Sequence, residues 1–198
     1  MKIVVLATEE NFETLRQMNT AAEWIQVTDV KDFEKHPEAD AYFNLADNAA
    51  EMEHPVLNKP IFAHSVTQSL PSHIIRINAW NGFLENTSWE VAGNITDSAK
   101  KLLTYLNKRV IVCADEPGFI SARIIAMIIN EAYYAKQEGV STSSEIDTAM
   151  KLGTNYPYGP FEWAAKIGEK NIYALLKKLS LQDERYKPAT LLTKTAAQ

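Results

Sequence analysis

Cysteine and glycine are scarce in this chain of 198 residues. The single cysteine, Cys113, excludes a disulfide framework and any zinc site built from several cysteines. All seven glycines lie at or after Gly82, so residues 1–81 contain none. The first half of the chain therefore lacks the glycine-rich turns that cradle phosphate groups in nucleotide-binding proteins.

Other absences narrow the class of protein. The net charge of −5 predicts no nucleic-acid partner. No apolar run reaches membrane-spanning length, and the opening MKIVVLATEENFE does not resemble a signal peptide, which predicts a cytoplasmic protein with no membrane partner. The stretch Glu51–His54 carries liganding side chains but has no second cluster at metal-binding spacing, so no metal site is predicted.

Hydrophobic patterning divides the chain in two. Short apolar runs alternate with amphipathic segments in the first half, which predicts a mostly parallel sheet covered by helices. The expected strands are 2–7, 23–28, 41–45, 60–63, 73–80, 89–92 and 109–114, and the expected helices are 11–18, 30–35 and 96–107. The second half predicts helices alone, at 120–138, 144–152, 161–167 and 171–179, with Ser144 and Asp147 as a capping box.

Charge follows the same division. Residues 1–107 carry 8 basic and 15 acidic side chains, a net charge of −7, whereas residues 108–198 carry 12 basic and 10 acidic, a net charge of +2. We predict two domains, at residues 1–115 and 116–198. The last strand expected in the first domain, Arg109–Ala114, is an apolar run and is predicted to be buried.

A set of motifs in the second half carries a family resemblance. They are Pro117–Phe119, Asn130–Ala132, Glu138–Val140, Glu145–Asp147, Ala149–Gly153, Tyr156–Glu162 and Arg185–Pro188. In order and spacing this region closely resembles the C-terminal domain of 3-hydroxyacyl-CoA dehydrogenases. The resemblance implies a reduced Rossmann-like domain, followed by a helical domain of the 6-phosphogluconate-dehydrogenase C-terminal type that builds a homodimer.

The family's cofactor loop is missing from this sequence. A GxGxxG turn would fall on Ala7–Phe12, where Glu9 and Glu10 stand instead and would repel a pyrophosphate. We therefore expect no NAD cofactor. Asp29 falls where the family's acid holds the ribose hydroxyls, although a helix cap is the simpler interpretation.

The resemblance also implies a degenerate catalytic site. The family's general-base histidine is matched by Asn78, and its orienting glutamate by Glu90. Asn81 matches a second family asparagine. An amide cannot accept a proton near neutral pH, so the role of the base is vacant, and Glu90 is expected to hydrogen-bond Asn78 instead.

Further family positions are changed or shifted. The family asparagine before Arg123 is replaced by Ala122, and the family's substrate-contacting serine falls on Val66, with Ser65 or Thr67 as substitutes one residue away. His64 is the one histidine expected at the carboxyl end of a strand, where it could replace the base.

These features predict a 3-hydroxyacyl-CoA dehydrogenase-like protein without activity, serving as a dimeric binding or regulatory module for an acyl-CoA-like ligand. Two alternatives stay open: a divergent, active oxidoreductase on an acyl-CoA-like substrate, and a purely structural interaction partner. Because the helix Ile120–Glu138 is apolar on most sides, we expect the dimer to form through the helical domain and to weaken, or the fold to fail, on replacing Ile125 or Ile129 with aspartate.

Overall fold

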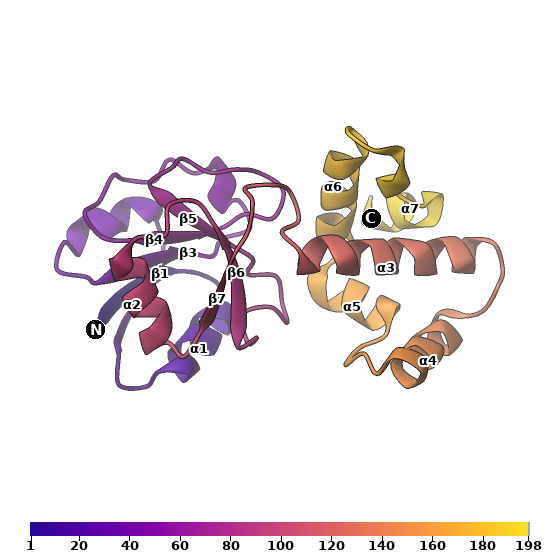
Figure 1. The fold of residues 1–198 in the computed structure, drawn as a ribbon, viewed down its shortest axis with the longest axis horizontal. Coiled ribbons are helices and arrows are strands. Elements are labelled where there is room, and N and C mark those ends of the chain that lie inside the picture. The colour runs from indigo at the N-terminus through magenta and orange to yellow at the C-terminus, as the bar shows by residue number, and fades with distance from the viewer. Residues whose placement is uncertain (198) are drawn as a thin grey trace. The chain divides into compact units, whose positions relative to one another are not determined.

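The computed structural model describes residues 1–197 of a chain that divides into two compact units, Met1–Phe119 and Ile120–Gln198. The division falls four residues beyond the expected boundary. Figure 1 shows strands and helices in the first unit and helices alone in the second. The predicted fold class is confirmed.

The first unit is built on a seven-stranded sheet in the order β2-β1-β3-β4-β5-β6-β7. All neighbouring strands run parallel except β5 and β6, which are antiparallel. The strands are β1 (Lys2–Leu6), β2 (Glu23–Val27), β3 (Ala41–Asn44), β4 (Ile61–His64), β5 (Ile74–Ile77), β6 (Ser88–Ala92) and β7 (Arg109–Val112). In the sheet, β2 lies on one side of β1 and β3 lies on the other side. The direction in which strands are added therefore reverses after β2, and the topological switch point lies between β1 and β3.

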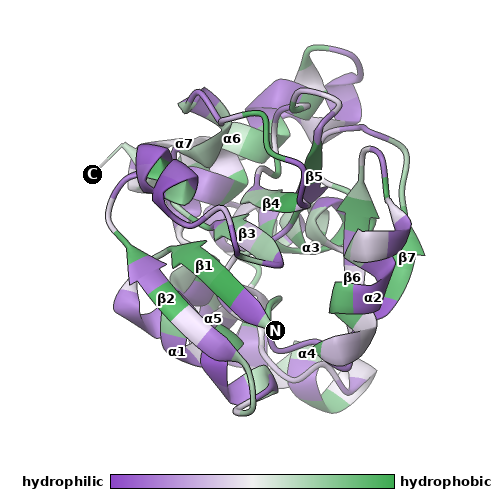
Figure 2. Cartoon of the chain, turned by 90° about the vertical axis from the view of Figure 1, so that its left-hand side faces the viewer, coloured by the Kyte–Doolittle hydropathy of each residue, from purple (hydrophilic) through white to green (hydrophobic). Residues whose placement is uncertain are grey.

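Side chains alternate between the two faces of the sheet, and each face has its own core. On one face Ile3, Val5 and Phe43 pack with helices α1 (Glu9–Met18) and α2 (Asp97–Tyr105). The other face, with Val4 and Tyr42, is covered by the short 3-10 helices η1 (Val30–Lys35) and η2 (Ala49–Glu51). Figure 2 shows the apolar colour concentrated on strands such as β1 and the polar colour on the outer helix α1.

One strand differs from its predicted environment. Arg109–Ala114 was expected to be buried on both faces, but β7 ends at Val112 and forms the edge of the sheet. Ile111 and Val112 are accordingly 42% and 66% exposed. An apolar run alone cannot distinguish a central strand from an edge strand, because both carry the same β-branched residues.

The second unit packs around one long helix, α3 (Ser121–Gln137), which contacts every other α-helix of the unit (Figure 1). These are α4 (Ser143–Thr154), α5 (Pro160–Ile167), α6 (Glu169–Ser180) and α7 (Thr190–Ala196), and η3 (Glu184–Tyr186) lies between α6 and α7 in sequence. The sequence reasoning did not include α7.

The predicted capping box of α4 is wrong by two residues. Thr142 accepts a hydrogen bond from the Glu145 amide, and the Glu145 carboxylate accepts one from the Thr142 amide. Asp147 is buried, and its carboxylate accepts hydrogen bonds from the amides of Phe161 (2.8 Å) and Glu162 (3.2 Å), at the start of α5. Asp147 therefore caps a neighbouring helix rather than its own.

Candidate functional site at the carboxyl edge of the sheet

The turn after β1 is closed to an anion by its own side chains. The Thr8 hydroxyl accepts a hydrogen bond from the Asn11 amide (3.3 Å) and so takes one of the amides that a bound phosphate would use. Glu9 and Glu10 are both exposed in the first turn of α1 and place two negative charges there. The residues present do not fit a dinucleotide pyrophosphate.

Asp29, at the carboxyl end of β2, acts as a helix cap. Its Oδ1 accepts a hydrogen bond from the Lys31 amide at 2.9 Å, which starts η1. This is the helix-cap role that the sequence allowed for Asp29.

The chain leaves β5 in a turn that fixes the orientation of Asn78. The Trp80 amide donates to Asn78 Oδ1 at 3.0 Å, so the side-chain amide cannot rotate without losing this bond. Asn78 Nδ2 is buried and has no hydrogen-bond partner among the described residues. This turn also ends the strand at Ile77, three residues before its predicted end.

The bond predicted between Glu90 and Asn78 is absent. The antiparallel register of β5 and β6 pairs Arg76 with Ala92 and Ile77 with Val91, and Asn78 follows β5 directly. A carboxylate can only accept from the Asn78 Nδ2, and that nitrogen has no partner. Asn81 lies exposed in the turn that follows β5.

His64, the last residue of β4, is held by the same turn. The Ala79 amide donates to His64 Nδ1 at 2.9 Å. A backbone N–H can only donate, so Nδ1 holds the ring's lone pair and the neutral ring carries its proton on Nε2. Burial lowers the pKa of His64 to about 4, against a smaller opposing effect of the Asp47 charge. His64 is therefore a neutral hydrogen-bond donor and not a replacement for the general base.

His54 is likewise unavailable as a base. The Asn44 Oδ1 accepts from the Ala46 amide (3.2 Å), which directs Asn44 Nδ2 toward His54 Nε2 at 3.0 Å. The imidazole must then accept this bond, and burial also lowers the pKa of His54. The side chain of His54 is buried, 8% exposed.

The candidates for the substrate-contacting serine have other partners. The Ser65 hydroxyl donates to the Gln68 carbonyl (2.6 Å) and accepts from the Gln68 amide (3.3 Å), which stabilises the turn after β4. Thr67 is partly exposed in that turn. Val66 is buried, and its carbonyl accepts from the Gly118 amide at 2.7 Å.

Arg76 is a buried charge that the sequence reasoning missed, because it sits inside the apolar strand β5. It is 1% exposed, and its guanidinium lies 3.0 Å from the Asp115 carboxylate and 4.3 Å from the centroid of the Phe119 ring. It also donates to the carbonyls of Gln68 and Glu116. These contacts attach the last residues of the first unit to the sheet.

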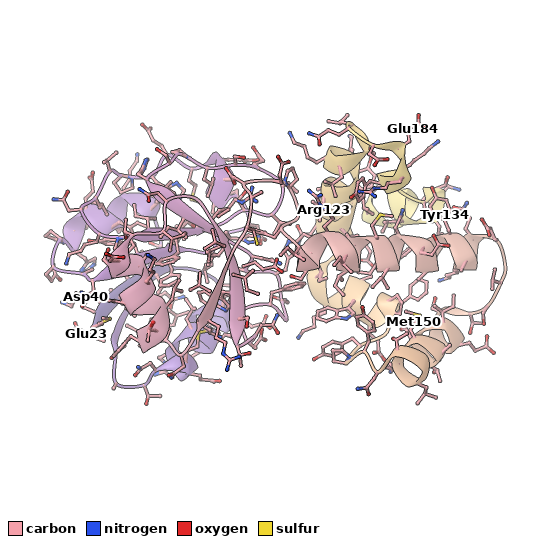
Figure 3. The ribbon with its side chains drawn as sticks, viewed as in Figure 1. Glu23, Asp40, Arg123, Tyr134, Met150 and Glu184 are labelled. Atoms are coloured by element: carbon pink, nitrogen blue, oxygen red, sulfur yellow. The ribbon has the colours of Figure 1, made fainter. Side chains whose placement is uncertain are left out.

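The two remaining family positions belong to the second unit. Ala122 is fully buried in the first turn of α3. Arg123, labelled in Figure 3, has its guanidinium 5.9 Å from the centroid of the Tyr186 ring. The neighbouring family motif has a structural role, since Asn130 donates to the Lys187 carbonyl (2.9 Å) and accepts from the Ala189 amide (2.8 Å).

Residues 1–197 contain neither a metal-binding cluster nor a membrane-spanning helix. This part of the chain contains no group of three or more histidine, cysteine, aspartate or glutamate side chains that could hold a metal ion. Nor does it contain a helix that is long and apolar enough to cross a membrane.

Comparison with known proteins identifies the class that the helical unit defines. Residues 118–198 match the family described as 3-hydroxyacyl-CoA dehydrogenase, C-terminal domain. The C-terminal part of the chain thus belongs to this family of domains, as the sequence motifs predicted.

The curated relatives are longer than this chain. It is 46% identical over 110 residues to 3-hydroxyadipyl-CoA dehydrogenase of Escherichia coli, a match that covers 53% of this chain and 23% of the relative. It is 41% identical over 110 residues to a probable 3-hydroxybutyryl-CoA dehydrogenase of Deinococcus radiodurans, covering 54% of this chain and 38% of the relative. The chain therefore matches less than two fifths of the length of these relatives.

The solved structures agree on the fold. The crystal structure of (S)-3-hydroxybutyryl-CoA dehydrogenase from Ralstonia eutropha matches with a TM-score of 0.74 at 19% identity, over 99% of this chain and 93% of that one. At this identity the likeness shows the fold alone, a Rossmann-like sheet followed by a helical domain.

Proposed function

We propose that this protein is a non-catalytic member of its family that keeps a ligand-binding site at the carboxyl edge of the sheet. One observation carries the proposal: the two imidazoles at this edge have their lone pairs occupied. His64 Nδ1 accepts from the Ala79 amide, and His54 Nε2 accepts from Asn44. With Asn78 at the position of the base, this edge offers no imidazole to take a proton from a substrate hydroxyl.

The misfit of the cofactor supports the same proposal. Hydride transfer in this family needs NAD, whose pyrophosphate binds at the start of the first helix. Here that turn is capped by Thr8 and carries Glu9 and Glu10. Asn78 replaces the general base, and the turn that would bind the cofactor is changed as well. The loss of only one of these two features would leave part of an active site.

Assembly is proposed as a homodimer through the helical unit. The exposed large apolar side chains of this unit include Ile124 (50%), Val140 (70%) and Leu152 (83%). A second copy of the helical unit would cover such a surface.

The test combines a ligand panel with an activity assay. Thermal unfolding is measured with NAD, NADH, CoA and acetoacetyl-CoA, because a ligand that binds the folded protein raises the midpoint. We expect acetoacetyl-CoA to raise it, NAD and NADH to leave it unchanged, and NADH oxidation with acetoacetyl-CoA to be absent.

Two outcomes would contradict the proposal. NADH oxidation in proportion to protein concentration would identify a divergent oxidoreductase. A midpoint that none of the four compounds changes would favour a purely structural partner.

A further inference from the structure

A pocket lies at the amino edge of the sheet, the edge opposite the carboxyl ends of β4 and β5. Its volume is about 200 Å³, and residues within 57–60, 72–75 and 94–98 line it. The first two segments lead into β4 and β5. The third follows β6, which ends at this edge because it runs antiparallel to β5, and it leads into α2. The amino-edge pocket is therefore built from chain segments that are distant in sequence.

The charge of the amino-edge pocket is opposite to that of the unit around it. Residues 1–107 carry a net charge of −7, but the lining of the pocket includes Lys59 and His73 and no acidic side chain. Lys59 forms no ion pair within residues 1–197. The carboxylate of Asp97, which follows the lining residue Thr96 in sequence, lies 3.2 Å from the Lys100 ammonium group. This distribution of charge favours an anion in the pocket.

Several hydrogen-bond donors of the lining have no partner in the described part of the chain. The side chains of Asn58, Ser72 and Asn94 form no hydrogen bond there, and neither does the backbone amide of Ser98 in the first turn of α2. With Lys59 these donors come from different sides of the pocket. A phosphate group has three strong acceptor oxygens in a tetrahedral arrangement and suits such a set better than a planar carboxylate, which has two.

The apolar part of the lining and the volume define the rest of the ligand. Leu57 is half-buried, and Pro60 and Ile75 are buried, so these side chains offer apolar surface beside the polar groups. A volume of about 200 Å³ is smaller than the roughly 300–1,000 Å³ of sites that hold drug-sized ligands. The pocket therefore has room for a phosphate group with an apolar substituent of a few carbon atoms.

From these observations we infer that the amino-edge pocket binds a phosphate monoester with a short apolar substituent, held by Lys59 and the Ser98 amide. This inference goes beyond the proposed function, because it concerns the other edge of the sheet and does not depend on the family's cofactor or substrate. The polar side chains of the lining are exposed and stay hydrated, so the dissociation constant should be about 1 mM.

Three probes separate the anion from its substituent: propyl phosphate, inorganic phosphate and butyrate. Each is titrated into ¹⁵N-labelled protein, and the amide signals of Asn94 and Ser98 report binding. Propyl phosphate should bind at least about fourfold more tightly than inorganic phosphate, which is the contribution of one buried methylene group. Butyrate should bind roughly fivefold more weakly than propyl phosphate, because it carries less charge and one acceptor oxygen fewer.

Two substitutions at one position test the charge of the pocket. Ser98→Asp places a carboxylate in the lining, and Ser98→Asn is the matched control with nearly the same shape and no charge. An aspartate in the first turn of a helix favours the helix, so the fold of the Ser98→Asp variant should be kept. Its affinity for propyl phosphate should be at least about tenfold lower than that of Ser98→Asn.

A second pair of variants tests the role of Lys59. Lys59→Gln should weaken the binding of propyl phosphate roughly fivefold, whereas Lys59→Arg should keep it. The matched control is Lys31→Gln, because Lys31 is an exposed lysine of η1, which follows the carboxyl end of β2. This control should change the affinity less than about twofold.

Three results would overturn the inference: equal losses in Lys59→Gln and Lys31→Gln, equal affinities of Ser98→Asp and Ser98→Asn, or binding of butyrate as tight as that of propyl phosphate. Equal binding of propyl phosphate and inorganic phosphate would overturn the apolar substituent. Thermal unfolding of each variant shows that its fold is kept. The proposed function is tested separately by NADH oxidation and by acetoacetyl-CoA, so the failure of one proposal is distinguishable from the failure of the other.

Discussion

The buried, neutral state of His64 predicts a loss of stability in acid. In the unfolded chain the imidazole has its ordinary pKa of 6.5, and in the folded protein burial lowers the pKa to about 4. Between these two values the unfolded state binds more protons than the folded state. The free energy of unfolding therefore falls as the pH falls from 6.5 to 4, and it is unaffected by this group well above pH 6.5.

The expected magnitude follows from the two pKa values. A difference between 6.5 and about 4 corresponds to about 3 kcal/mol of unfolding free energy, since each pH unit is worth about 1.4 kcal/mol. The His64→Asn variant has no titrating ring at this position. Its stability relative to the unmodified protein should therefore improve by about 3 kcal/mol between pH 7 and pH 4.

Urea unfolding at a series of pH values measures this difference. A Trp163→Phe background removes the one tryptophan of the helical unit, so the fluorescence of the remaining tryptophans, at positions 24, 80 and 89, reports the first unit. Carboxylates and His54 also titrate in this range, but they are common to both proteins and cancel in the comparison. If the two proteins lose the same free energy from pH 7 to pH 4, His64 is not held in a buried, neutral state.

Three further predictions address the cofactor, the helical unit and assembly. NAD should bind with a dissociation constant of about 1 mM or weaker, and a micromolar value by calorimetry would refute the argument from the capped turn. Asp147→Ala should destabilise the helical unit by about 2 kcal/mol in thermal unfolding, because the amides of Phe161 and Glu162 lose a buried carboxylate; an unchanged midpoint would contradict this role. Ile124→Asp should convert the proposed dimer to a folded monomer in sedimentation, whereas Ile129→Asp should unfold the helical unit, since these side chains are 50% and 0% exposed. A monomeric unmodified protein at micromolar concentration would refute the proposed dimer.

The last of these predictions revises the expectation from sequence. Ile125 and Ile129 both read as candidates for the interface, but they are 8% and 0% exposed within one chain and contribute to its own core. Apolar periodicity predicts that several sides of α3 are covered. It does not distinguish a side covered by helices of the same chain from a side left for a second copy. The exposed Ile124 belongs to the same apolar pattern, and nothing in the sequence distinguishes it from the buried isoleucines Ile125 and Ile129.

Element types could be predicted from the sequence because strong local signals agree with the fold. All seven strands and the helices up to α6 were predicted within a few residues of their bounds. The helix α7 was missed, because Thr190–Ala196 is short and its one buried side chain, Leu192, gives no periodicity. The capping of α5 by Asp147 joins two helices, and no local pattern contains such a contact.

The site was harder to predict because its chemistry depends on orientation. The sequence predicted that His64 stands at the end of a strand, and β4 does end at His64, while Asn78 directly follows β5. It could not show that the amides of Ala79 and Trp80 occupy the two acceptor atoms, since this follows from the path of the turn after β5. For the same reason His64 was considered as a base when its geometry makes it a donor.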